Sequence, residues 1–305
     1  MGNRIIKFIF FGNYFIGFLA IVLSLETSFQ LRLHFNSFVY YLLLFCGTVM
    51  YYTYAYAGTP VFQMQANPRS EWYRQHAGFV KFSQVILFVV TVLSGIFIVI
   101  KHWHNILKMP LQYWLAGAFI PIAALLYYGL LPRSFIKLNL RNTGWLKAFV
   151  IGFVWACAVG LLPVIMLQIE RGSYFADPVL QVWLFIKNWM FCTVNAIMFD
   201  LKDYADDSNK QLKTFVVRFG LRKTIFFVLI PLLLIGFFSM VAFAQYRHFS
   251  WIPLAFNLMP FILLLMVAYS MHRPKKILYY LIVIDGLLLV KAVCGILGMQ
   301  FFTHV

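Results

Sequence analysis

Residues 179–210 read VLQVWLFIKNWMFCTVNAIMFDLKDYADDSNK, an apolar run of membrane length that ends in a cluster of acidic side chains. The cluster holds four of the nine acidic residues of the chain: Asp200, Asp203, Asp206 and Asp207. About 20 apolar residues in a helix cross the ~30 Å hydrocarbon core of a bilayer. The stretch therefore predicts a membrane helix with negative charge concentrated at one end, which is typical of a site for a divalent cation.

The remainder of the sequence repeats the apolar pattern. Hydrophobic residues make up 63% of the 305 residues, and charged residues only 11%. Such a composition predicts an all-α polytopic membrane protein without a soluble domain. We expect residues 1–305 to form a single domain of nine membrane helices, at 5–25, 37–57, 82–100, 112–131, 145–168, 179–199, 224–244, 250–270 and 278–302.

Basic residues are distributed unequally between the two faces that these helices define. Most of the 25 Lys and Arg side chains fall on the face that contains the N-terminus. Positively charged loops stay inside, so we expect the N-terminus inside and the C-terminus outside, in the cytoplasmic membrane of a prokaryote. The basic residues are scattered over several short loops, which favours contact with anionic lipid head groups and disfavours a nucleic-acid partner.

The acidic residues at the end of the sixth expected helix have a regular spacing. Asp200, Asp203 and Asp207 follow at i, i+3 and i+7, so a continuing helix would place them on one face. Three carboxylates so close together repel one another unless a cation lies between them. Mg²⁺ takes oxygen ligands and typically binds through one or two carboxylates together with phosphate groups of a substrate. The spacing therefore predicts a site for a metal-bound phosphate or diphosphate.

Basic residues follow the carboxylates directly. They are Lys210, Lys213, Arg218, Arg222 and Lys223. Lysine and arginine side chains bind phosphate oxygens that a metal leaves uncovered. The order of the segment, acids first and bases second, is consistent with a diphosphate-binding loop.

The segments FDLKDYADD (199–207) and KTFVVRFG (213–220) resemble the second aspartate-rich motif of the UbiA-type intramembrane prenyltransferases. In that family D-x-x-D-x-x-x-D precedes a sequence similar to K-T-x-x-V-R-x-G, and the motif follows the sixth of nine membrane helices. The resemblance covers the whole chain in expected topology and residues 199–220 in specific motif.

This resemblance implies a UbiA-like bundle of nine helices with a central cavity accessible to lipid. The inner loops 58–81 and 200–223 would cap the active site. Two Mg²⁺ ions would hold the diphosphate of a polyprenyl donor at the cytoplasmic membrane face, and the prenyl group would pass to an acceptor. Metal and basic side chains would stabilise the departing diphosphate, while the closed site would keep water away from the allylic cation.

The resemblance also implies roles for individual residues. Asp200, Asp203 and Asp207 would be the catalytic metal ligands, with Lys213 and Arg218 in contact with the diphosphate. Two further groups are candidates from position alone. Lys137 and Arg141, in the loop after the fourth helix, lie on the expected inner face, where topology signalling is the alternative explanation. Tyr54 lies at the inner end of the second helix, where its ring could stabilise a cation or simply pack at the interface.

The sequence departs from the family at the second helix. The family carries another aspartate array there, yet residues 48–79, TVMYYTYAYAGTPVFQMQANPRSEWYRQHAGF, contain no aspartate, and Glu71 is their one carboxylate. Three explanations stay open. The protein is a catalytically silent relative that binds a lipid or a partner, or it uses one metal site with another phosphorylated substrate, or Glu71 and nearby groups substitute in part.

Ionisable groups also interrupt the sixth and the last helices. Asp285 and Lys291 lie in the last expected span, where an ionisable side chain is expensive and is either functional or part of a buried pair. Lys187 and Asn188 interrupt the sixth span and are expected to pair across helices. Together the charged groups offer limited support for a secondary transporter, which needs such residues on several spans. The four cysteines lie in apolar runs and are expected to be buried small hydrophobic residues.

Overall fold

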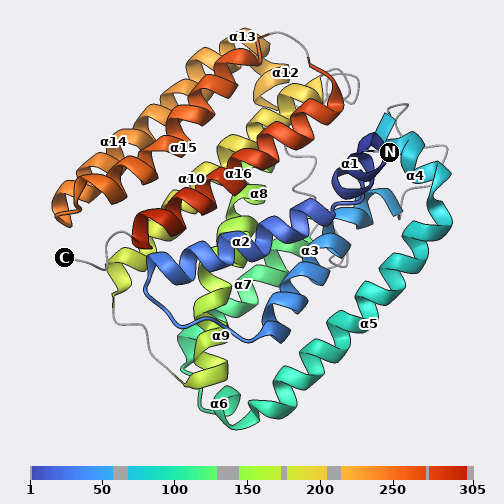
Figure 1. The fold of residues 1–305 in the computed structure, drawn as a ribbon, viewed down its shortest axis with the longest axis vertical. Helices are drawn as coiled ribbons and strands as arrows, with labels where there is room; N and C mark the ends of the chain where they lie inside the picture. Colours follow the sequence, from blue (N-terminus) through green and yellow to red (C-terminus); the bar gives the residue numbers. More distant parts are fainter. Residues whose placement is uncertain are drawn as a thin grey trace. The chain divides into compact units, whose positions relative to one another are not determined.

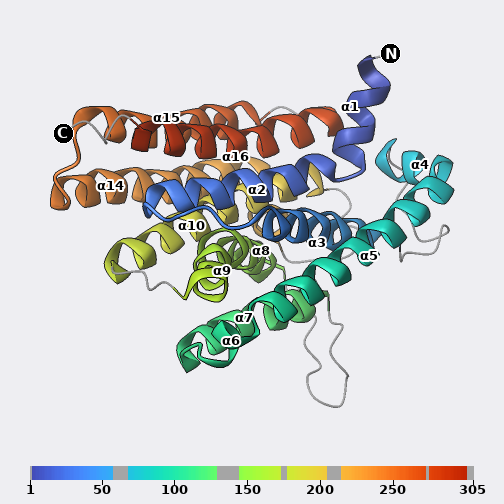
Figure 2. The same cartoon turned by 60° about the horizontal axis from the view of Figure 1, so that its bottom comes forward.

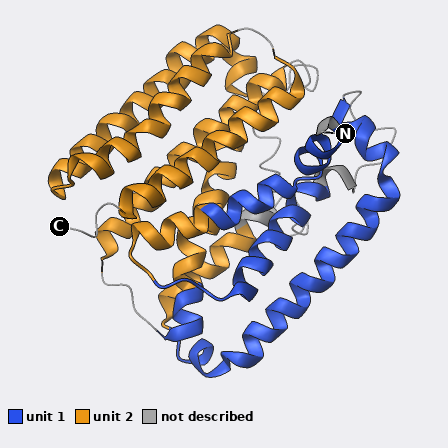
Figure 3. Ribbon diagram, in the orientation of Figure 1, with its two compact units in different colours: residues 1–22, 34–109, 166–173 blue, residues 23–33, 110–165, 174–305 orange. Residues whose placement is uncertain are grey.

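The computed structural model describes residues 2–57, 68–128, 144–172, 177–204, 214–272 and 275–300. Within these residues every regular element is a helix, as Figure 1 shows. The all-α prediction is therefore confirmed for the described part of the chain. The helices cluster into two compact units (Figure 3), and the expected single domain stays a prediction.

Unit 1 contains residues 1–22, 34–109 and 166–173. Its described helices are α1 (Gly2–Phe11), the first part of α2 (Tyr14–Gln30), α3 (Phe38–Ala57), α4 (Pro68–Gln75), α5 (Ala77–Lys101) and α6 (Trp103–Leu107). Helices α3 and α5 pack along each other, around Cys46, Val49 and Leu87. On its other side α5 exposes large apolar side chains such as Phe82 and Leu93. A continuous exposed apolar face of this kind fits contact with lipid.

The first expected span is bent, which the sequence did not predict. Helices α1 and α2 meet at 62°. The break lies at Asn13, whose φ of 64° is left-handed and cannot continue an α-helix. Beyond the break, α2 runs to Gln30, five residues past the expected end of the span. Glu26 therefore lies inside a helix instead of in a loop.

Unit 2 contains residues 23–33, 110–165 and 174–305. Its helices are α7 (Leu111–Tyr128), α8 (Leu146–Ala156), the π-helical segment η3 (Cys157–Leu161), the start of α9 (Leu162–Arg171), α10 (Pro178–Lys202), α12 (Phe215–Phe219), α13 (Leu221–Thr224), η4 (Ile225–Leu229), α14 (Ile230–Tyr246), α15 (Trp251–Ser270) and α16 (Ile277–Gln300). Helix α10 packs against α8, α14 and α16, and α15 lies between α14 and α16 (Figures 1 and 2). The buried face of α10 therefore forms much of the interior of unit 2.

Six helical segments in the described residues are long and apolar enough to cross a membrane. They are Ala77–Lys101, Leu146–Arg171, Pro178–Lys202, Leu221–Tyr246, Trp251–Ser270 and Ile277–Gln300. The bent α1–α2 pair makes a seventh if it counts as one span, and α3 and α7 contain the shorter apolar helices Phe38–Tyr54 and Leu111–Ile122. Each expected segment thus falls on an apolar helix, consistent with an integral membrane protein. The count of nine crossings and the orientation of the termini stay predictions.

The start of α10 is fixed by a charged cap. The Leu180 N–H donates to Asp177 Oδ1 over 3.0 Å, and Arg247 donates to the other carboxylate oxygen. The Leu180 hydrogen bond, and to a lesser extent Arg247, hold the pKa of Asp177 below its usual value. Asp177 therefore stabilises the fold in its ionised form.

This cap predicts a pH dependence at the acid end of the range. Because folding lowers the pKa of Asp177, the ionised carboxylate contributes fully to the free energy of unfolding above the ordinary aspartate pKa of about 3.9. This contribution is lost as the pH falls through the lowered pKa. Asp177→Asn keeps an oxygen acceptor but does not titrate. We expect the thermal midpoint of the wild type to fall more than that of the variant between pH 6 and pH 3. The difference should correspond to about 0.5 kcal/mol, the size of an exposed ion pair. Equal falls in both proteins would contradict the assignment.

Candidate functional site

The predicted metal ligands lie at the end of α10. Asp200 is buried in the last turn of the helix, and Asp203 is its C-cap, with its N–H donating to the Phe199 carbonyl over 3.2 Å. The helix extends three residues beyond the expected end at 199, so both carboxylates belong to helix α10 and its cap. Asp207, the third predicted ligand, is outside the described residues.

Each of the two described carboxylates contacts a lysine. Lys147 Nζ lies 2.8 Å from Asp200 Oδ1, and the Asp200 side chain is only 3% exposed. Lys202 Nζ lies 2.5 Å from Asp203 Oδ1, on a more accessible surface. A buried carboxylate needs such a partner, because an uncompensated charge in a low-dielectric interior is expensive. From the sequence, Lys147 belonged with Lys137 and Arg141 to an inner loop, as a topology signal or a diphosphate contact, and it was not connected with Asp200.

The close packing of α8 on α10 places Lys147 beside Asp200. Gly152 in α8 approaches the backbone of α10 so closely that an added Cβ would lie 2.7 Å from the Thr193 nitrogen. Trp189 Nε1 donates to the Phe149 carbonyl over 2.9 Å, which fixes the register of the two helices. Lys147 lies five residues before Gly152, so this contact controls the position of its ammonium group.

Helix α12 brings the basic segment of the motif to the same unit. The helix begins at Thr214, whose hydroxyl accepts the Val217 N–H over 3.3 Å, and ends at Gly220 with φ of 79°. The Phe215 ring contacts Trp145 and Phe149, at the Lys147 end of α8. Arg218 on this helix is exposed and therefore accessible to a ligand. Lys213, directly before the helix, lies outside the described residues, as do Lys137 and Arg141.

The donor atoms at this end of α10 fit Mg²⁺ in kind. Carboxylate oxygens are its preferred protein ligands, and Asp200 and Asp203 supply them one helical turn apart. No group of three His, Cys, Asp or Glu side chains suited to a metal is found within the described residues. Lys147 contacts one oxygen of the Asp200 carboxylate, so a metal at this position would share the carboxylate with the lysine or replace it.

The segment that lacks the first aspartate array has a structural role in its described part, α4. Arg69 Nη2 donates to Asn13 Oδ1 over 2.5 Å, and the Tyr73 hydroxyl donates to the Phe11 carbonyl over 2.9 Å. Helix α4 therefore braces the bend between α1 and α2. The Glu71 carboxylate is bound by Arg74 and Gln75 of its own helix.

The predicted residues thus divide between the two units. Asp200, Asp203 and Arg218 belong to unit 2, whereas Tyr54 and Glu71 belong to unit 1. Tyr54 lies near the end of α3 and is exposed. Its proposed place at a cavity mouth stays a prediction.

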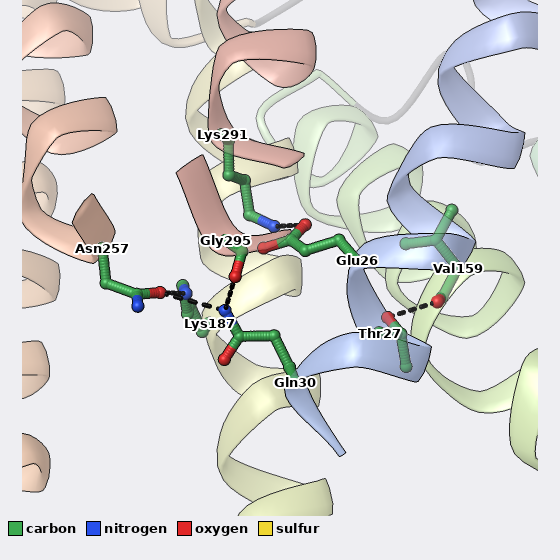
Figure 4. A network of polar contacts seen from close by, with 8 residues as sticks. All are labelled: Glu26, Thr27, Gln30, Val159, Lys187, Asn257, Lys291 and Gly295. Carbon is green, nitrogen blue, oxygen red and sulfur yellow. Dashed lines mark hydrogen bonds and ion pairs between the residues drawn. The ribbon is translucent and has the colours of Figure 1, made fainter. Parts of the chain in front are cut away.

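A second polar cluster, which sequence reasoning missed in part, lies within unit 2 (Figure 4). Glu26 Oε2 lies 2.6 Å from Lys291 Nζ, and both side chains are only 1% exposed. Lys187 Nζ donates to Asn257 Oδ1 over 2.7 Å, which confirms the expected pairing of Lys187 across helices. Gln30 Nε2 donates to the same amide oxygen over 3.2 Å. The cluster therefore joins α2, α10, α15 and α16.

One signal in the sequence could have identified this cluster. An acid at the end of the first apolar run has a charge opposite to that of two lysines in later apolar runs. Because the first helix was expected to end at Leu25, Glu26 was placed outside the membrane and was not considered as a partner for Lys187 or Lys291. The four cysteines are buried, as expected.

Comparison of the chain with protein-family models, with curated proteins and with solved structures finds no match.

Proposed function

We propose that this protein binds a magnesium-complexed polyprenyl diphosphate at the Asp200 end of α10 and transfers the prenyl group to an acceptor. The observation that carries the proposal is the pair Asp200 and Asp203, one turn apart at the end of a helix of membrane length. The nearby α12, with the exposed Arg218, adds positive charge of the kind that binds phosphate.

Each residue would have a distinct role. Asp200, Asp203 and Asp207 would hold Mg²⁺, which would supply positive charge to the diphosphate as it leaves. Lys147 would keep Asp200 neutralised in the metal-free protein and, once released, would face the diphosphate oxygens. Lys213 and Arg218 would bind the outer phosphate, with Lys137 and Arg141 as further basic contacts and Tyr54 as an aromatic group at the mouth of the site.

The test is transfer of labelled polyprenyl diphosphate in membranes containing the protein and Mg²⁺. We expect Asp203→Asn to reduce product about 100-fold or more, because removal of one group that stabilises charge in the transition state typically lowers the rate by this factor. Asp177→Asn, an aspartate at the opposite end of α10, serves as the matched control and should retain activity. Equal product from the wild type and Asp203→Asn would contradict the catalytic role.

A catalytically silent, lipid-binding protein is the second candidate. It is favoured by Glu71, whose carboxylate is engaged within α4 instead of completing a second acidic array. A silent protein would bind labelled polyprenyl diphosphate in a Mg²⁺-dependent manner and yield no transfer product. Loss of that binding in Asp203→Asn would then locate the site without implying catalysis.

A further inference from the structure

Lys187 is a basic side chain in the interior of a membrane-length helix. It is only 6% exposed and lies nine residues from the Pro178 end of α10. Along the helix it is about 20 Å from Asp200, at 1.5 Å per residue. A charged side chain in the middle of a helix of membrane length is costly and marks a functional-site hypothesis by default. It lies too far from Asp200 to belong to the site proposed above.

The neighbours of Lys187 do not neutralise it. Its ammonium group donates to the Asn257 amide oxygen and lies 5.6 Å from the centre of the Trp183 ring. No carboxylate lies within ion-pair distance of it in the described part of the chain. The nearest acid in the cluster, Glu26, is held by Lys291 through Oε2. One carboxylate therefore faces two ammonium groups, which leaves an excess of one positive charge.

The residue next to Lys187 in the chain also has unsatisfied polar atoms, on the side of α10 that faces Gly160 of η3. Asn188, which follows Lys187, is buried, and neither its Oδ1 nor its Nδ2 has a hydrogen-bond partner in the described residues. A buried amide that lacks partners costs stability, as does an ammonium group with one acceptor for its three donors. A ligand with a negative charge and several acceptor oxygens would satisfy the ammonium group.

We propose that Lys187 anchors a second binding site, which takes a membrane-soluble anion with a carboxylate or phosphate head. The apolar, membrane-length helices that pack against α10 favour a ligand with an apolar tail, and the excess charge favours an anionic head. Lys187 supplies the ion pair, and the polar contact with Asn257 keeps its ammonium group in position.

The experiment measures binding to the purified full-length protein in a neutral detergent. Labelled oleate is the carboxylate probe, lysophosphatidate is the phosphate probe, and oleyl alcohol is the uncharged control with the same chain length. We expect the wild type to bind one or both anions about 10-fold to 100-fold more tightly than the alcohol, the strength of a charged hydrogen bond. The stronger of the two anions identifies the head group.

Variants separate charge from structure. Lys187→Gln keeps an amide donor for Asn257 but removes the charge, and should reduce anion binding to the level of the alcohol. Lys187→Arg keeps the charge and should retain most of the binding. Lys101→Gln, which alters an exposed lysine of α5, should bind as the wild type does. Equal binding of anions and alcohol by the wild type would overturn the proposal even if Lys187→Gln failed to fold, and so would unchanged anion binding in Lys187→Gln.

Discussion

Gly152→Ala is expected to lower the free energy of unfolding by about 3 kcal/mol, the upper part of the range for over-packing. The added methyl group would lie 2.2 Å from Thr193 Oγ1, 2.7 Å from the Thr193 nitrogen and 2.9 Å from the Trp189 carbonyl oxygen. Two of these atoms are backbone, so a rotamer change cannot relieve the clash. Helices α8 and α10 would have to separate. Small residues at such contacts are what allows membrane helices to approach closely.

The measurement is the thermal midpoint of the purified protein, together with the yield of folded protein. Gly286→Ala is the matched control, since its added methyl group would meet no atom within 4 Å. We expect that variant to unfold at or slightly above the wild-type temperature, because alanine favours a helix more than glycine does. Thr193→Ala in the Gly152→Ala background should restore only part of the stability, since the backbone contacts remain. A wild-type midpoint for Gly152→Ala would refute the packing argument.

Removal of one partner from the Glu26–Lys291 pair is expected to be at least as damaging. Glu26→Gln leaves the Lys291 ammonium group buried and unpaired, which costs about 3–5 kcal/mol. Glu26 also packs against Gly295, where an added Cβ would lie only 2.5 Å from Glu26 Oε1, so the absence of a side chain leaves room for the carboxylate. The pair is therefore built into the contact between α2 and α16.

A double-mutant cycle distinguishes the pair from its surroundings. Glu26→Leu with Lys291→Leu removes both charges, and we expect it to be within about 1–2 kcal/mol of the wild type, since apolar replacements of buried ion pairs are often neutral or stabilising. Either single change to leucine should be much less stable than the double variant. Additive single effects, without this recovery, would mean that the two side chains are not coupled.

The apolar helices could be predicted from the sequence because they depend on local composition. A helix such as α10 requires only a continuous apolar run, and its acidic end is visible within residues 179–210. The bend at Asn13 was not predictable in this way. It depends on Arg69 and Tyr73, more than fifty residues away, which bind the polar groups that the break in the helix leaves free.

The candidate site was likewise predictable in one part only. The spacing of Asp200 and Asp203 is a property of one helix, and the structure retains it. The Lys147–Asp200 contact depends on how α8 packs on α10. This packing cannot be predicted from the pattern of apolar residues in either helix. The Glu26–Lys291 ion pair was missed for the same reason, because Lys291 lies near the other end of the chain and only the packing of α2 on α16 brings the two together.

The separation of Glu26 and Lys291 also has a consequence for biosynthesis. The two residues are 265 positions apart, so a ribosome adding roughly 5–20 residues per second makes the lysine about 13–53 s after the acid. During that interval the nascent chain carries the Glu26 carboxylate of α2 without Lys291, its ion-pair partner in the finished protein. Chains that stop before α16 lack this ion pair, although Lys187 of α10, in the same cluster, has by then been made. The Glu26–Lys291 pair is therefore one of the last contacts of the buried cluster that the growing chain can form.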